Sequence, residues 1–162
     1  MSLAPRSPAD SFTEMVQVVL PNDANPMGFA LGGYVMHQID IVGAIAAHRH
    51  TRSLLVTAAV DGLQFLHPIL VGDLIIVHAR VTGAFRTSVE VEVEVFSEGT
   101  LTGKRRLTSV AYLTFVTLEQ NGVRTSVPPL RLDTADDHRR STEATHRRAA
   151  RLRDKLDRNP HA

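Results

Sequence analysis

The clearest pattern in the chain is the alternation of valine with glutamate between residues 88 and 96. Every second position is apolar, and the positions between them carry negative charge. The alternating residues are Val89, Val91, Val93 and Val95 on one side and Glu90, Glu92 and Glu94 on the other. A period of two residues is that of a β-strand. We therefore predict a sheet with one face buried in the core and the other face in water.

Apolar segments of similar length predict four more strands. These segments are residues 14–20, 54–66, 73–85 and 107–118. The connections between the later strands are short, which excludes the long crossovers that parallel strands need. We therefore expect an antiparallel sheet.

One long helix is predicted between the first two strands. After Gly32 and Gly33, apolar residues recur at spacings of three and four, which is the period of an amphipathic helix. They are Val35, Met36, Ile39, Val42, Ile45 and Ala46. The helix is expected to end near Arg49, so that His48 and His50 place positive charge at the negative end of the helix dipole.

This helix is the only apolar element able to cover the sheet. Residues 12–130 are therefore predicted to form one α+β domain, an antiparallel sheet wrapped around one long central helix. Residues 131–162 form a charged C-terminal tail that holds nine of the 18 lysines and arginines. Within this tail, residues 142–157 have a helix-forming composition with a thin apolar stripe, at Ala149, Leu152 and Leu156. Two interpretations stay open: a solvated and partly frayed tail, or a helix that docks on a neighbouring subunit or an acidic ligand.

Composition narrows the class of protein. The chain has 162 residues, of which 43% are hydrophobic and 22% charged, as is typical of a soluble globular domain. A net charge of +1 argues against a nucleic-acid partner, and the absence of cysteine excludes disulfides, thiolate metal sites and a cysteine nucleophile. The first ten residues lack the apolar run of a signal peptide or membrane anchor, so we expect a cytoplasmic protein.

Several common catalytic motifs are absent from the sequence. It contains no G-x-S-x-G, no G-x-x-x-x-G-K-[ST], no H-E-x-x-H and no G-x-G-x-x-G in a βαβ setting. Phosphoryl transfer, zinc proteolysis and dinucleotide redox chemistry are therefore disfavoured. The eight histidines do not cluster at ligand spacing, so we predict no metal site.

Asp40 stands out because it lies in the middle of the apolar helix. Aspartate is a poor helix former, and an ionised carboxylate is costly to bury without a partner. One interpretation is a rim position, where the carboxylate reaches solvent or pairs with His37, one turn earlier. The other is a general base or nucleophile, tuned by partial burial.

The glycine pair at the helix start is the second candidate feature. The free N–H groups of a first helical turn can hold a developing oxyanion, and glycine lets a substrate approach closely. Seven residues separate Gly33 from Asp40, which is about 10 Å along a helix axis. One carbonyl cannot reach both. If both act in one reaction, they come from different copies of the chain, and a two-fold dimer is the simplest such arrangement.

The order of several segments resembles the hotdog-fold acyl-CoA thioesterases, in the branch of the YciA-like bacterial enzymes and brain-type acyl-CoA hydrolase. The resemblance rests on residues 23–47, 56–73, 85–95, 97–116 and 127–130. It implies a helix-in-sheet protomer, an obligate homodimer often assembled into trimers of dimers, and hydrolysis of acyl-CoA to free acid and CoA. It implies no metal or redox cofactor.

The resemblance also assigns the site. Asp40 matches the family's acidic helix residue, Gly32 and Gly33 match its glycine pair, and Asn25 and Gly28 match the preceding loop.

Phe29 departs from the family's pattern. It stands where this branch usually carries Asn or Asp, a residue expected to face Asp40 across the dimer. Either hydrolysis is weakened, or Phe29 fills an apolar acyl tunnel and another polar group, such as Asn25 or Asn22, has taken over.

Two basic regions are candidates for binding the phosphates of CoA. Lys104 and Arg105 begin a basic run after a flexible turn, although this run equally fits a hairpin end in solvent. Arg86 and Ser88 are assigned mainly by the resemblance.

The leading function is therefore an acyl-CoA thioesterase. The alternative, motivated by Phe29, is a non-catalytic or weakly catalytic CoA-binding protein. A hotdog hydratase is disfavoured because the helix offers Asp40 without the His-led catalytic segment of those enzymes.

Overall fold

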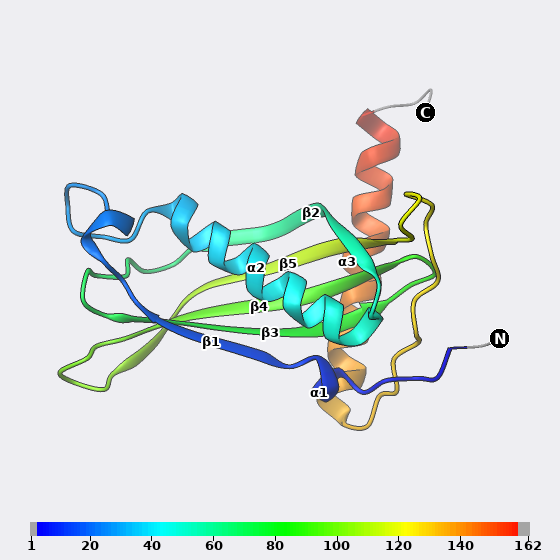
Figure 1. Cartoon of the computed structure of the whole chain (residues 1–162), viewed down its shortest axis with the longest axis horizontal. Helices are drawn as coiled ribbons and strands as arrows, with labels where there is room; N and C mark the ends of the chain where they lie inside the picture. The colour runs from blue at the N-terminus through cyan, green and yellow to red at the C-terminus, as the bar shows by residue number, and fades with distance from the viewer. Residues whose placement is uncertain (1–2, 159–162) are drawn as a thin grey trace.

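The computed structural model describes residues 3–158 and contains one five-stranded antiparallel sheet (Figure 1). The strand order is β1-β3-β4-β5-β2. The strands are β1 Thr13–Val18, β2 Leu54–Phe65, β3 Leu74–Ala84, β4 Ser88–Glu98 and β5 Arg105–Leu118. The helices are α1 Pro8–Ser11, α2 Gly32–Thr51 and α3 Ala135–Arg158, with a short 3₁₀ turn η1 at Pro21–Asp23. The predicted antiparallel sheet around a central helix is confirmed.

The core lies between α2 and one face of the sheet. The four valines of β4 are fully buried there, as the alternation predicts. Gly43 lies at a close approach of α2 to the sheet, because a Cβ at this position would lie 3.4 Å from both Phe115 and Val93. The central helix therefore packs directly over β4 and β5.

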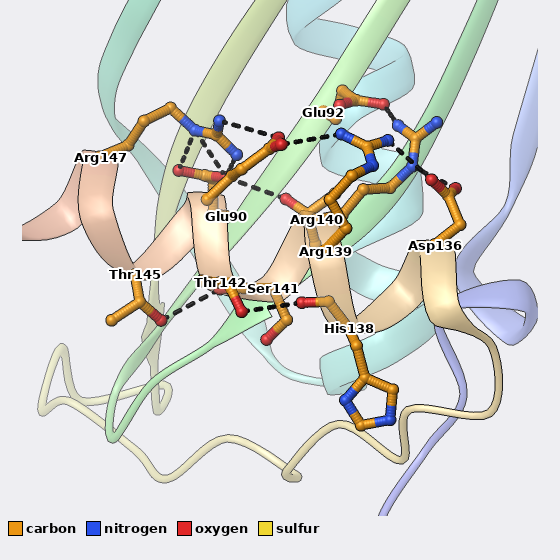
Figure 2. Close-up of polar contacts among 12 residues, drawn as sticks. Glu90, Glu92, Asp136, His138, Arg139, Arg140, Ser141, Thr142, Thr145 and Arg147 are labelled. Carbon is orange, nitrogen blue, oxygen red and sulfur yellow. Dashed lines mark hydrogen bonds and ion pairs between the residues drawn. The ribbon is translucent and has the colours of Figure 1, made fainter.

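The opposite face of the sheet is covered by α3, so the prediction that it lies in water is wrong. Glu90 is fully buried, and its carboxylate accepts hydrogen bonds from the guanidinium of Arg147, the closest at 2.8 Å (Figure 2). Two residues further along β4, Glu92 pairs with Arg140. Two of the three charges that indicated a solvated face, Glu90 and Glu92, are thus neutralised by arginines from a distant part of the chain.

Helix α3 begins earlier than predicted, and it docks through different residues. Thr134 and Asp137 cap it reciprocally, each side chain accepting a backbone N–H of the other at 3.0 Å. The predicted stripe is not the packing face, since Leu152 and Leu156 are 43% and 64% exposed. Both interpretations of the tail missed that it packs on its own sheet. The boundary at residue 130 stays a prediction, and residues 159–162 lie outside the described part.

The end of α2 differs from expectation at His50. Its side chain is fully buried, and Nε2–H donates a 2.8 Å hydrogen bond to the carbonyl of Pro128. Burial lowers the pKa of His50 below its ordinary value of 6.5. The prediction that His50 supplies charge to the helix end is therefore wrong.

Candidate active site

Asp40 and Thr57 face one another between the central helix and the edge strand. Asp40 is half-buried on α2, and its Oδ1 accepts a 2.7 Å hydrogen bond from the Thr57 hydroxyl. Thr57 lies at the irregularity in the pairing of β2 with β5, before Ala59. The partner of Asp40 is thus Thr57 rather than His37. No hydrogen bond among residues 3–158 engages the other carboxylate oxygen.

These two side chains open on a hollow of about 350 Å³, which we call the Asp40 hollow. Its lining is otherwise mainly apolar. The remaining lining residues are Gly33, Met36, His37, Ile39, Val60, Leu63 and Leu113. A carboxylate with one fixed oxygen therefore borders an apolar space able to take a hydrocarbon chain.

The start of α2 leaves backbone donors without helical acceptors. Leu31 precedes the helix and gives it no side-chain cap, and the first intrahelical bond runs from Val35 N to Leu31 O. The N–H groups of Gly32 and Gly33 therefore lie ahead of the hydrogen-bonded ladder. A Cβ at Gly33 would meet nothing within 4 Å, so this position is open to a ligand.

The Asn25 loop is a tight turn held by the Asn25 side chain. Asn25 Oδ1 accepts from the N–H groups of Met27 and Phe29, at 3.0 and 3.1 Å. Gly28 has a φ of +78°, a conformation that glycine adopts without strain. The Asn25 side-chain amide N–H₂ forms no hydrogen bond within the described residues.

Apart from Gly28, the sequence-predicted catalytic and loop residues line two hollows of one protomer. Asn25, Phe29 and Gly32 line a separate hollow of about 310 Å³, which does not include Asp40 or Gly33. Phe29 does therefore line an apolar space. The prediction that Asp40 and the loop meet across a dimer stays a prediction.

The predicted phosphate-binding residues do not come together. Arg86 precedes β4 and Ser88 is its first residue, whereas Lys104 and Arg105 lie beyond the other end of this strand. The strand is roughly 33 Å long, at about 3.3 Å per residue. Arg105 pairs with Glu98 at 3.0 Å, so its charge is already partnered. Within one protomer these residues cannot hold the same phosphate group.

Sequence reasoning missed Thr57. A single threonine in a strand has no pattern of its own, although it lies inside the segment 56–73 that carried the resemblance. Within residues 3–158, no group of three or more His, Asp or Glu side chains is placed to hold a metal ion. The prediction of no metal site stays a prediction. None of the helices described is long and apolar enough to cross a membrane.

Comparison with known proteins decides the family. The model of the thioesterase superfamily matches residues 27–104. An uncharacterised acyl-CoA thioester hydrolase of Bacillus subtilis, YkhA, is 36% identical over 138 residues, covering 83% of this chain and 80% of the relative. The chain belongs to the thioesterase superfamily. The human cytosolic acyl coenzyme A thioester hydrolase is 33% identical over 88% of the chain, which spans only 38% of that longer relative.

Solved structures of thioesterases share the fold. An acyl-CoA hydrolase from Bacillus cereus superposes with a TM-score of 0.91 at 30% identity, covering 96% of this chain and 95% of that one. A hexameric acyl-CoA thioesterase gives 0.90 at 34% identity, covering 94% and 98%. The Staphylococcus aureus acyl-CoA hydrolase, in complex with butyryl-CoA and CoA, gives 0.88 at 30% identity, covering 96% and 94%. The predicted hotdog fold, the family resemblance and the assignment as a thioester hydrolase are confirmed.

Proposed function

We propose that this thioesterase hydrolyses acyl-CoA to a carboxylic acid and CoA, with Asp40 as the group that activates water. The observation that carries the proposal is the Asp40 carboxylate, fixed by Thr57 at the edge of an apolar hollow. The hydrogen bond leaves the second oxygen available as a base. The apolar lining suits the acyl chain of a thioester.

The Staphylococcus aureus enzyme supports the choice of residues. Its solved structures include alanine variants of one asparagine, one aspartate and one threonine. The second and third of these positions follow the first by 15 and 32 residues. Asp40 and Thr57 follow Asn25 by the same intervals in this chain. This agreement favours Asn25, rather than position 29, as the polar group that works with Asp40.

The reaction balances with Asp40 as the only proton carrier. The carboxylate accepts a proton from water as the water oxygen bonds to the thioester carbonyl carbon, which gives a tetrahedral oxyanion. When the carbon–sulfur bond breaks, the sulfur of CoA takes the proton from Asp40. The products are the acid and the free thiol, and the carboxylate is regenerated. No metal or redox cofactor enters these steps.

The oxyanion donors are assigned to a second subunit. The amide of Asn25 and the N–H group of Gly32 are available donors, but in one protomer they border a different hollow from Asp40. Gly33 borders the Asp40 hollow of its own protomer. A homodimer brings Asn25 and Asp40 together. The edge strand β2 is the natural seam, since it exposes apolar side chains and has a free backbone edge. The exposed residues are Leu54, Val56, Val60 and Phe65.

The oligomeric state beyond the dimer and the cellular location are proposed by analogy with the relatives. Solved relatives include hexameric thioesterases, so a trimer of such dimers is the proposed assembly. The human relative is named cytosolic, and we assign this chain to the cytoplasm. The proposed partners are the acyl-CoA substrate and further copies of the chain, without nucleic acid or membrane.

The direct test is turnover of a panel of acyl-CoAs of increasing chain length by the wild-type protein and by Asp40→Asn. Asparagine keeps the size and the hydrogen bond from Thr57 but cannot accept the proton. We expect wild-type hydrolysis and near-background rates for the variant, at equal thermal stability. Equal turnover by the two proteins would remove Asp40 from the mechanism. A burst of CoA release ahead of the acid would instead identify Asp40 as a nucleophile.

The alternative is a CoA-binding protein with little hydrolysis, and Phe29 motivates it. Phe29 lines the same hollow as Asn25 and Gly32 and offers no polar side chain there. Micromolar CoA binding with background turnover, together with a gain of rate in Phe29→Asn, would favour this alternative.

A further inference from the structure

The edge strand β2 carries one extra residue, Ala58, directly after Thr57. In the pairing with β5, Thr57 lies opposite Phe115, and Ala59 lies opposite the neighbouring residue Thr114. β2 therefore uses two residues where β5 uses one, which is a β-bulge. A bulge bends its strand and redirects the side chains that flank it, and bulges are common beside active sites for this reason.

The bulge places Thr57 and Asp61 on opposite faces of the sheet. Four residues apart on a regular strand, the two side chains would share one face. Instead, Thr57 lies opposite Phe115, which belongs to the core under α2. Asp61 lies opposite Tyr112, whose ring is covered by the guanidinium of Arg147 from α3 at 3.6 Å. Thr57 thus reaches the central helix, and Asp61 reaches α3.

On the α3 side, the carboxylate of Asp61 is bound by Arg151. The Arg151 guanidinium donates a 2.5 Å hydrogen bond to Oδ2 of Asp61, and both side chains are partly buried. Arg151 follows Arg147 by one helical turn, so both cations leave the same face of α3. Arg147 in turn pairs with the buried Glu90 (Figure 2). The ion pair of Arg151 with Asp61 therefore ties the edge strand to an anchored helix.

The backbone of β2 is weakly constrained in this stretch. β2 is the outermost strand of the sheet next to β5, so within one protomer its ladder has a single partner. A second irregularity follows between Asp61 and Gln64, where Gly62 has a φ of +66°. The regular pairing of residues 59–61 is thus interrupted on both sides. Side-chain contacts therefore contribute more to fixing this short block than they would in a continuous ladder.

We propose that α3 positions Thr57 for the reaction, through the ion pair of Arg151 with Asp61. The pair fixes the block 59–61 on one side of the bulge, and the bulge then directs the Thr57 hydroxyl at Asp40. Arg151 and Asp61 are positioning residues, because neither of them lines the Asp40 hollow. The inference rests on the proposed function, in which Asp40 activates water.

The first test measures hydrogen exchange and does not depend on hydrolysis. Peptide-resolved exchange is compared between the wild-type protein, Asp61→Asn and the control Arg139→Gln, which removes a charge whose partners lie on α3 itself. We expect Asp61→Asn to speed the exchange of residues 54–61 by about two- to fivefold and to leave β4 unchanged, as does the control throughout. Unchanged exchange in β2, or an equal rise in β4, overturns the inference whether or not the protein is a thioesterase.

Steady-state kinetics then test the link to Thr57. We expect Asp61→Asn and Arg151→Gln each to lower kcat for acyl-CoA by about three- to fivefold, with KM changed by less than about twofold. The double variant Asp61→Asn/Arg151→Gln should lose no more than either single variant, because both remove the same contact. In a Thr57→Ala background, Asp61→Asn should lower kcat no further.

Asp61→Asn also separates positioning from ligand binding, because it removes the ion pair and keeps the Arg151 cation. A raised KM in Arg151→Gln together with wild-type kinetics in Asp61→Asn would assign Arg151 to a ligand and contradict the inference. Equal losses of kcat in the wild-type and Thr57→Ala backgrounds would show that the pair does not act through Thr57, which also contradicts it. Absence of turnover in the wild-type protein would refute the proposed function, while the exchange result would still decide whether the ion pair holds β2.

Discussion

The Thr57 hydroxyl donates a 2.7 Å hydrogen bond to Oδ1 of Asp40 and so joins the central helix to the edge strand. A hydrogen bond to a charged group is worth about 1.5–3 kcal/mol. We expect Thr57→Ala to lower kcat for acyl-CoA by about ten- to a hundredfold, because the carboxylate loses its fixed orientation. Thr57→Ser keeps the hydroxyl, so its kcat should stay within roughly a few-fold of the wild-type value. Wild-type turnover by Thr57→Ala would show that this contact has no part in the reaction.

Asn25 offers a way to separate turn formation from chemistry. Its Oδ1 holds the loop by accepting from Met27 and Phe29, whereas its amide N–H₂ has no such task. Asn25→Asp keeps the acceptor oxygens and removes the donor. We predict an unchanged melting temperature and a fall in kcat of about 10²–10³, the typical effect of losing one oxyanion donor. If the activity falls only in proportion to the melting temperature, Asn25 has a structural role alone.

The docking of α3 depends on the buried pair of Glu90 and Arg147. Arg147→Met leaves the Glu90 carboxylate buried without its partner, which typically lowers the free energy of unfolding by about 3–5 kcal/mol. Urea unfolding should show this loss, and Glu90→Gln in the same chain should recover much of it. Arg139→Met is the control, because Arg139 pairs on the surface and such pairs contribute about 0–1 kcal/mol. Equal effects of the two single variants would contradict the assigned burial.

His50 should make the unfolding free energy fall at mildly acidic pH. Burial lowers its pKa in the folded state, whereas the unfolded chain titrates near the ordinary value of 6.5. The unfolded state therefore takes up the proton first. The contribution of neutral His50 is complete above about pH 6.5 and is lost as the pH falls toward and through the lowered folded-state pKa.

The measurement is the free energy of unfolding against pH for wild type, His50→Gln and the exposed control His48→Gln. Glutamine can still donate to the Pro128 carbonyl but does not titrate. We expect His50→Gln to flatten the curve below pH 6.5, which is the ordinary pKa of His50. A control variant that flattens it equally would assign the effect elsewhere.

Local patterns were sufficient to predict the sheet and the central helix. The alternation around Val91 and the helical spacing around Ile39 arise because each element buries one face, so the information lies within a few neighbouring residues. Asp40 was found for the same reason, as a charge that breaks an apolar helix. The start of α3 was missed because the prediction rested on helix composition, whereas the signal lies in the spacing of Thr134 and Asp137, which is that of a capping box.

Contacts between distant segments could not be predicted. Glu90 looked solvent-exposed because its partner, Arg147, lies 57 residues further along the chain. Thr57 belongs to the same class, since only the fold brings it beside Asp40. A charge is read from the sequence as exposed unless its partner is known.

The central claim is that each active site takes Asp40 from one subunit and Asn25 from its mate, and subunit complementation tests it most directly. Asp40→Asn and Asn25→Ala are purified separately, each with little activity, then mixed under conditions that exchange subunits. Random pairing restores about a quarter of the sites, because half of the dimers are mixed and each has one intact site. We therefore predict recovery to about one quarter of wild-type turnover. Mixed dimers that form but show no gain of activity would contradict the account.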